Sequence, residues 1–145
     1  MSISEKIFIT GINGFIGRNL SDYLLRNNKE IYGLVRNNKH VFSKRINFII
    51  GDLLVPETYK SILDENTTIF HSAAHITFNN DGYNKANLIN AEGTRVLLES
   101  AYEKKVKKVV HLSACAVLGV STTKNELIDN LHISICQFAK RQMSF

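Results

Sequence analysis

A glycine-rich stretch, Thr10–Gly17 (TGINGFIG), constrains the fold most because it joins two segments of different periodicity. Before it, Lys6–Thr10 (KIFIT) is a short apolar run rich in β-branched residues, typical of a strand buried on both faces. After it, apolar residues recur at helical spacing up to Arg26. A strand that turns through glycines directly into a helix is the start of a βαβ unit, which favours a parallel sheet.

The same alternation continues along the chain. Further strands are predicted at Glu30–Arg36, Ile46–Ile50, Thr68–His71 and within Val106–Ser113. Further helices are predicted from Pro56 to about Leu63 and over Asn84–Lys104. On the second of these helices we expect the inward residues to be Leu88, Ala91, Val96, Leu98 and Ala101. The crossover Asn37–Lys44 is short and polar, and its helix is hard to see. The pattern predicts an α/β fold, a Rossmann-type doubly wound parallel sheet of about five strands.

Length and charge narrow the possible functions. The 145 residues predict one domain, and 44% hydrophobic with 21% charged residues is ordinary for a globular chain. The net charge of +5 could suggest a nucleic-acid binder. The lysines Lys104, Lys105, Lys107 and Lys108 cluster at the predicted end of a helix, however, where the helix dipole favours cations. We therefore expect no nucleic-acid partner, although the charge would help to attract an anionic dinucleotide.

The cysteines and the lengths of the apolar stretches indicate the cellular compartment of the protein. Cys115 and Cys136 form no CxxC pair and no disulfide framework. No apolar stretch approaches the length of a membrane span, and Met1–Lys6 lacks the apolar run of a secretory signal. We expect a cytoplasmic protein with free thiols and no membrane partner.

The three glycines of the turn also predict its ligand. Gly11 tolerates a positive φ, Gly14 lets the backbone approach a pyrophosphate, and Gly17 lets helix and strand pack closely. The helix N-terminus then presents unpaired N–H groups to the phosphates. Three glycines also occur in ordinary βα turns, but the strand before and the helix after them are the context that a dinucleotide loop requires.

The spacing GxxGxxG resembles the TGxxGFIG signature of the extended short-chain dehydrogenase/reductases, the NAD-dependent epimerase/dehydratase family. Further stretches resemble motifs of that family in the same order: Gly51–Leu53 (GDL), His71–Ala74 (HSAA), Asn90–Thr94 (NAEGT), and Val109–Ser113 with the ending Val117–Gly119 (VLG). The resemblance implies the cofactor-binding half of an NAD(P)-dependent oxidoreductase or epimerase. The stretch Leu34–Asn37 (LVRN) and the VLG ending resemble the flavonoid-reductase and hydroxysteroid-dehydrogenase branches more than they resemble the sugar epimerases.

The resemblance also implies which residues hold the cofactor. Asp52 would approach adenine, and the segment after the fourth strand would lie along the dinucleotide. The implied cofactor-binding residues are Thr10, Gly11, Asn13, Gly14, Phe15, Ile16, Gly17, Arg36, Asp52, Leu53, Ala73, Ala74, Asn90 and Lys140.

Arg36 bears on the choice between NAD and NADP. An acidic residue at the end of the second strand accepts hydrogen bonds from the ribose 2′-OH of NAD, whereas an arginine accommodates the 2′-phosphate of NADP. We expect NAD or NADP, with a slight preference for NADP. The alternative is a surface arginine at a strand end, and Arg18 and Asn37 either help or are bystanders.

The family's chemistry is incomplete in this sequence. The family uses a Ser or Thr to polarise the substrate oxygen, a Tyr to exchange the proton, and a Lys four residues later. Ala114 stands at the Ser/Thr position and Cys136 at the Tyr position, which leaves Lys140 as the one implied catalytic residue. Alanine donates no side-chain hydrogen bond, and a thiol is a weak donor. His71 and His75 have no carboxylate or cysteine near in sequence, so no metal is predicted.

Family members are longer than this chain, so we expect residues 1–145 to be an NAD(P)-binding Rossmann domain without the C-terminal substrate domain. One hypothesis is an enzyme lineage acting on a sugar-nucleotide, steroid or flavonoid-like alcohol or ketone. The other is a catalytically inactive dinucleotide-binding or scaffold protein. An uncovered sheet edge would invite association, as would apolar residues near the end of the chain, so we expect a homo-oligomer. These residues are Ile133, Ile135, Phe138, Met143 and Phe145.

Overall fold

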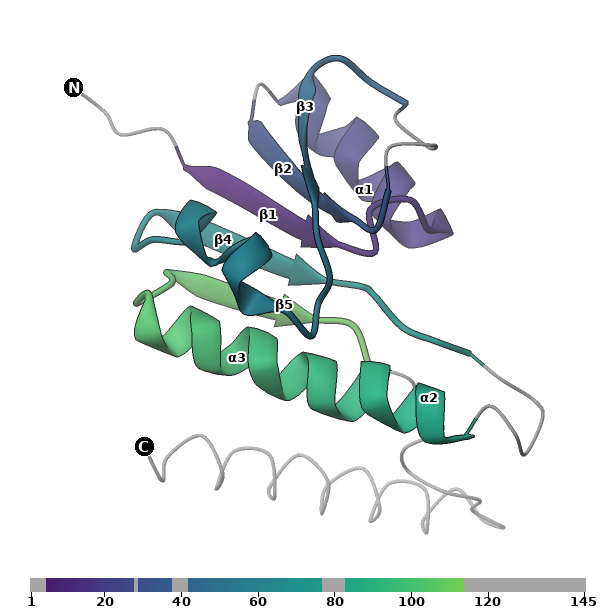
Figure 1. Cartoon of the computed structure of the whole chain (residues 1–145). Helices are drawn as coiled ribbons and strands as arrows, with labels where there is room; N and C mark the ends of the chain where they lie inside the picture. Colours follow the sequence, from purple (N-terminus) through teal and green to yellow (C-terminus); the bar gives the residue numbers. More distant parts are fainter. Residues whose placement is uncertain (1–4, 28, 38–41, 77–82, 114–145) are drawn as a thin grey trace, which may run out of the picture. The chain divides into compact units, whose positions relative to one another are not determined.

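Five parallel strands form the sheet of the computed structural model, which describes residues 5–27, 29–37, 42–76 and 83–113 (Figure 1). The strands are β1 (Lys6–Thr10), β2 (Glu30–Val35), β3 (Ile46–Ile50), β4 (Thr67–His71) and β5 (Lys108–His111). All five predicted strands are present. Strand β2 ends at Val35, so that Arg36 stands just beyond it. The residues 114–145, which include Ala114, Cys136, Lys140 and the predicted apolar contacts, lie outside the described part.

The order of the strands creates a topological switch point. Neighbours in the sheet run β3-β2-β1-β4-β5. The chain therefore builds outward from β1 to β3 and then crosses to the other side of β1 with β4. Side by side at the carboxyl ends stand Thr10 and His71, with His111 next to His71 on β5. In doubly wound sheets a ligand cleft opens at this point.

The helices cover both faces of the sheet. They are α1 (Phe15–Arg26), α2 (Tyr83–Asn87), a π-helical turn (Leu88–Glu92) and α3 (Gly93–Glu103). Leu24 and Leu25 of α1 pack with Ile7 and Ile9 of β1. Leu97 and Ala101 of α3 pack instead with Phe8. Because successive strand residues point to opposite faces, α1 and α3 lie on opposite sides of the sheet (Figure 1).

Two predicted helices differ in the structure. The segment from Pro56 consists of two 3₁₀ turns, Pro56–Thr58 and Lys60–Ile62. Tyr59 separates them because its ring is fully buried against Phe8 and its hydroxyl donates to the Leu53 carbonyl at 3.1 Å. Among the described residues of the Asn37–Lys44 crossover there is no helix. No described helix is long and apolar enough to cross a membrane.

The inward face predicted for the long helix is confirmed at Ala101 but is wrong at Leu88, Ala91 and Leu98. Its buried residues are Gly93, Leu97, Ser100 and Ala101, whereas Leu98 is 37% and Leu88 48% exposed. The adjacent Leu97 and Leu98 make two phases equally apolar. The small residues select the phase that buries Leu97. Gly93 packs so closely on Leu53 that a Cβ at position 93 would lie 2.7 Å from Leu53 Cδ2. The π turn then shifts Leu88 out of phase with α3.

A lysine ends α3 in a conformation that suits glycine. Lys105 has φ +52°. The Val106 N–H donates to the Ala101 carbonyl at 2.9 Å and the Lys105 N–H to the Tyr102 carbonyl at 3.0 Å. These two bonds form a Schellman motif with Lys105 at the left-handed position, where a Cβ costs free energy.

We therefore predict that Lys105→Gly raises the free energy of unfolding by about 1 kcal/mol, because glycine adopts the left-handed conformation without steric cost. Lys104→Gly, one residue earlier at φ −85°, is the matched control and should give no gain. Urea unfolding of the three proteins measures the difference. A Lys105→Gly protein that is no more stable than the parent would contradict the prediction.

Candidate functional site

Two glycines after β1 allow the backbone to pack without a gap. Gly11 has φ +72°, and a Cβ there would lie 2.6 Å from the Ala73 backbone nitrogen. A Cβ on Gly17 would lie 2.3 Å from the Gly11 carbonyl oxygen. Gly11 therefore fits the loop against the segment after β4, and Gly17 fits the first turn of α1 against the loop.

Gly14 has a different environment. It caps α1 with φ −76° and ψ 171°, a conformation open to any residue. Of the described atoms outside its own neighbours, a Cβ there would meet within 4 Å only the Gly11 carbonyl oxygen, at 3.2 Å. Gly14 is exposed and lines a cleft. Packing within the protein therefore does not require glycine here, and the absence of a side chain leaves the helix N-terminus open to the cleft.

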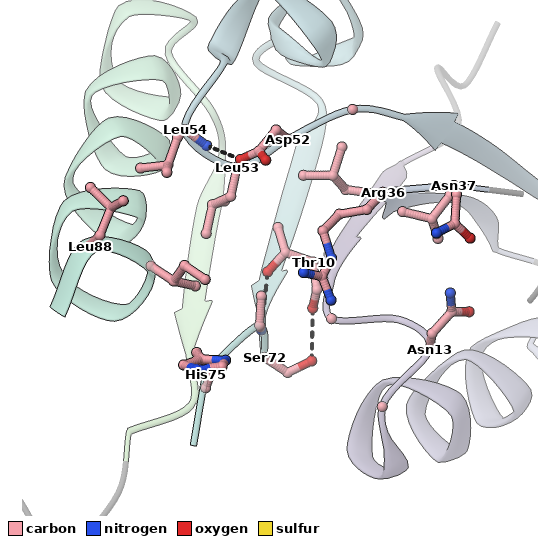
Figure 2. A pocket seen from close by; sticks show the side chains of 18 of the residues that line it. Thr10, Asn13, Arg36, Asn37, Asp52, Leu53, Leu54, Ser72, His75 and Leu88 are labelled. Atoms are coloured by element: carbon pink, nitrogen blue, oxygen red, sulfur yellow. Dashed lines mark hydrogen bonds between the residues drawn. The ribbon is translucent and has the colours of Figure 1, made fainter. Parts of the chain in front are cut away.

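The cleft has a volume of about 590 Å³ and lies across the carboxyl ends of the central strands (Figure 2). Its walls come from the glycine loop, the end of β2, the turn after β3, the segment after β4, and the helix from α2 into the π turn. Nine of the sequence-predicted residues line it: Thr10, Gly11, Asn13, Gly14, Arg36, Asp52, Leu53, Ala73 and Ala74.

The other predicted residues lie elsewhere. Phe15 and Ile16 are in the first turn of α1, 87% and 50% exposed, and Gly17 is buried beneath the loop. Asn90 acts on a cleft residue, since its side-chain oxygen accepts the His75 N–H at 2.7 Å and its nitrogen donates to the His75 carbonyl at 2.9 Å. Lys140 is outside the described residues.

Sequence reasoning missed residues in two of the walls. Leu54, Lys85, Leu88 and Ile89 also line the cleft. Leu54 directly follows the GDL stretch, so extending that motif by one residue would have found it. The other three depend on the π turn and on how α2 lies, which the sequence pattern did not indicate.

The charged groups of the cleft are mainly cationic. Neither Arg36 nor Lys85 makes a hydrogen bond or ion pair with another described residue. Figure 2 shows the Arg36 side chain extending from the end of β2 over the cleft. Asp52 already uses one carboxylate oxygen to accept the Leu54 N–H at 2.9 Å. The cleft therefore offers two cations and one partly engaged carboxylate, a balance that suits an anionic ligand.

Asn13 carries a polar atom that lacks a partner. Its side-chain oxygen is buried and accepts no hydrogen bond within the described protein. Buried acceptors are normally satisfied by protein, water or ligand, so this oxygen is available to accept a hydrogen bond from a bound molecule. A ribose hydroxyl can donate such a bond, and the bare backbone at Gly14 suits a phosphate. The residues present therefore fit a dinucleotide.

His71 lies beneath the cleft in a hydrogen-bonded network. Its Nδ1 is 2.6 Å from the Thr10 hydroxyl and its Nε2 is 2.8 Å from the Thr94 hydroxyl. The His111 ring stacks on it with centroids 4.9 Å apart. Burial, and secondarily the His111 ring, lowers the pKa of His71 to about 4, so the ring is neutral near pH 7. Among the described residues, no three His, Cys, Asp or Glu gather so that they could hold a metal ion.

Known proteins share this fold. A short-chain dehydrogenase/reductase superfamily protein from Agrobacterium tumefaciens, crystallised with bound NAD, superimposes with a TM-score of 0.69 at 21% identity over 79% of this chain and 34% of its own. An epimerase from Methanothermobacter thermautotrophicus gives a TM-score of 0.69 at 27% identity over 83% and 39%.

The relatives with assigned names include a reductase and a dehydrogenase. A putative dihydroflavonol 4-reductase of Synechocystis is 27% identical over 83% of this chain and 36% of its own length. A GDP-6-deoxy-D-talose 4-dehydrogenase of Aggregatibacter actinomycetemcomitans is 33% identical over 82% and 38%. The chain thus spans about a third of the length of the curated relatives it matches. The model of the NAD dependent epimerase/dehydratase family matches residues 7–143, and this chain belongs to that family.

Proposed function

We propose that the cleft binds an NAD(P) dinucleotide, and that the chain is the cofactor-binding part of an oxidoreductase or epimerase. Gly14 carries this proposal, because the described packing does not require glycine there and a side chain would enter the cleft. The N-terminus of α1 with the glycine loop would take the pyrophosphate. Asp52 and Leu53 would take the adenine, and the Asn13 oxygen a ribose hydroxyl. Bound NAD in the Agrobacterium protein, which shares the fold, supports the assignment.

We predict that Gly14→Val weakens dinucleotide binding at least about 100-fold while the fold survives, since its side chain would stand between the phosphates and the helix N-terminus. The backbone at Gly14 accepts a valine after a shift of a few tenths of an ångström at the Gly11 carbonyl. Calorimetric titration with NADP⁺ and NAD⁺ measures binding, and circular dichroism confirms folding.

Two further variants serve as controls. Asn19→Val places the same side chain on the exposed face of α1 outside the cleft and should bind like the parent. Gly17→Val should lose stability outright, because its Cβ would overlap the Gly11 carbonyl. A folded Gly14→Val protein that titrates like the parent would show that the loop is structural only.

We further propose that the cleft prefers NADP(H) to NAD(H), through Arg36. The guanidinium lies over the cleft without a partner among the described residues, and no carboxylate stands at its position to accept the ribose hydroxyls of NAD (Figure 2). A charge-assisted hydrogen bond to the 2′-phosphate is worth roughly 1.5–3 kcal/mol, enough for about a tenfold preference or more.

We predict that Arg36→Met lowers the ratio of NADP⁺ to NAD⁺ affinity about tenfold, mainly by weakening NADP⁺. Arg18→Met is the matched control, because the Arg18 guanidinium lies 5.0 Å from the centre of the Phe42 ring and does not line the cleft. Its affinity ratio should equal that of the parent. Tighter binding of NAD⁺ by the parent, or an unchanged ratio in Arg36→Met, would refute the preference.

The second candidate is a dinucleotide-binding protein without turnover. Ala114 and Cys136 favour it, because they replace the hydroxyl groups with which the resembling enzymes polarise the substrate and move the proton. Positioned acids and bases contribute typically about 10²–10⁴-fold in rate. The relatives carry names from the flavonoid-reductase, sterol and sugar-nucleotide classes, so the proposal keeps all three substrate classes.

A further inference from the structure

We propose that His71 is a positioning residue for the dinucleotide: its neutral ring, with the hydrogen on Nε2, ties the glycine loop on one side to α3 on the other. The inference rests on the proposed function, because the two structures that it joins are walls or supports of the cleft. The inference adds a role for His71, which holds the glycine loop and α3 in a fixed relation to each other. His71 itself is buried and does not line the cleft.

The hydrogen bonds around His71 fix the direction in which each one donates. The Thr94 hydroxyl donates to the Asn90 carbonyl at 2.6 Å, so towards His71 it can only accept. The bond of 2.8 Å between them is therefore donated by His71 Nε2. A neutral imidazole has one N–H, so Nδ1 is an acceptor and receives the Thr10 hydroxyl hydrogen at 2.6 Å. The Thr10 oxygen in turn accepts the Ala73 N–H at 3.3 Å.

The result is a continuous chain of donors that runs one way. It begins at the Ala73 N–H, passes through Thr10, His71 and Thr94, and ends at the Asn90 carbonyl. Thr10 and Ala73 line the cleft on the side of the glycine loop. Asn90 completes the link because its side-chain amide clamps the backbone of His75, another cleft residue. Thr10 and Ala73 are therefore in the cleft, His71 and Asn90 are one neighbour away from it, and Thr94 joins these two.

A charged His71 would break this chain. With a hydrogen on Nδ1, the ring would face the Thr10 hydroxyl as a donor, and that hydroxyl would have to turn away. The groups packed against the ring do not favour the charge: Thr10 on β1 and Thr94 on α3 are uncharged, and the titratable neighbour on β5 is His111. Burial lowers the pKa of both His71 and His111, which keeps the connection intact at neutral pH.

Thr94 is the place to test the connection, because it does not line the cleft. Thr94→Val keeps the shape but removes the acceptor for His71 Nε2, and Thr94→Ser keeps the hydroxyl. In folded proteins near pH 7 we expect Thr94→Val to weaken NADP⁺ binding about five- to tenfold and Thr94→Ser to stay within about twofold. A merely structural threonine would lower the unfolding midpoint of Thr94→Val and leave the dissociation constant unchanged, which would overturn the inference.

Nitrogen NMR of the parent provides the second measurement and needs no ligand. We expect His71 to show a hydrogen on Nε2 near pH 7 and to titrate near pH 4. A hydrogen on Nδ1 would overturn the inference even if Thr94→Val does not fold.

If the parent binds no dinucleotide, the proposed function fails and the positioning role fails with it. If the parent binds and Thr94→Val binds equally well, only the positioning role fails.

Discussion

The close approach of the glycine loop to the segment after β4 determines the rest of the site. Gly11 stands so near Ala73 that a Cβ would lie 2.6 Å from the Ala73 backbone nitrogen, and a Cβ on Gly17 would lie 2.3 Å from the Gly11 carbonyl oxygen. Side chains at either position would push β1, α1 and β4 apart. Because both are absent, the N-terminus of α1 opens at the carboxyl end of β1, and Gly14 is left facing the cleft.

The parallel sheet then brings distant parts of the chain to the same edge. The ends of β2, β3 and β4 carry Arg36, Asp52 and Ala73 to the walls of the cleft. The strand register also places Thr10, His71 and His111 in one row beneath it. Polar side chains buried there are costly unless they are hydrogen-bonded, and the one-way chain through His71 satisfies them without introducing charge.

The sequence predicted the parts of the fold that depend on local patterns. Apolar β-branched runs marked all five strands, and the glycine spacing marked the loop that reaches the cleft. Beyond Ala101, the inward face of α3 could not be predicted, because Leu97 and Leu98 are equally apolar and the choice depends on the fit of Gly93 against Leu53. The segment from Pro56 was also misjudged, because the burial of Tyr59 is a tertiary effect that outweighs local helix preference.

In the candidate site, too, the residues of local sequence motifs were predicted and those that depend on tertiary packing were not. The glycine stretch was found from its place between a strand and a helix, and the residues of the GDL and HSAA stretches were found from the family resemblance. Lys85 and Ile89 were missed because their positions depend on how α2 lies and on the π turn that follows it. The contacts of His71 were also beyond the sequence, since they join residues 61 and 23 positions apart.

Amide chemical shifts on addition of NADP⁺ test the central claim most directly, because they report which residues the dinucleotide touches. The account predicts changes at the glycine loop, at Asp52–Leu54, at Ala73–His75 and in the π turn, with the surface around Lys104–Lys108 unaffected. Absence of changes at saturating cofactor, or changes confined to the lysine-rich end of α3, would contradict it.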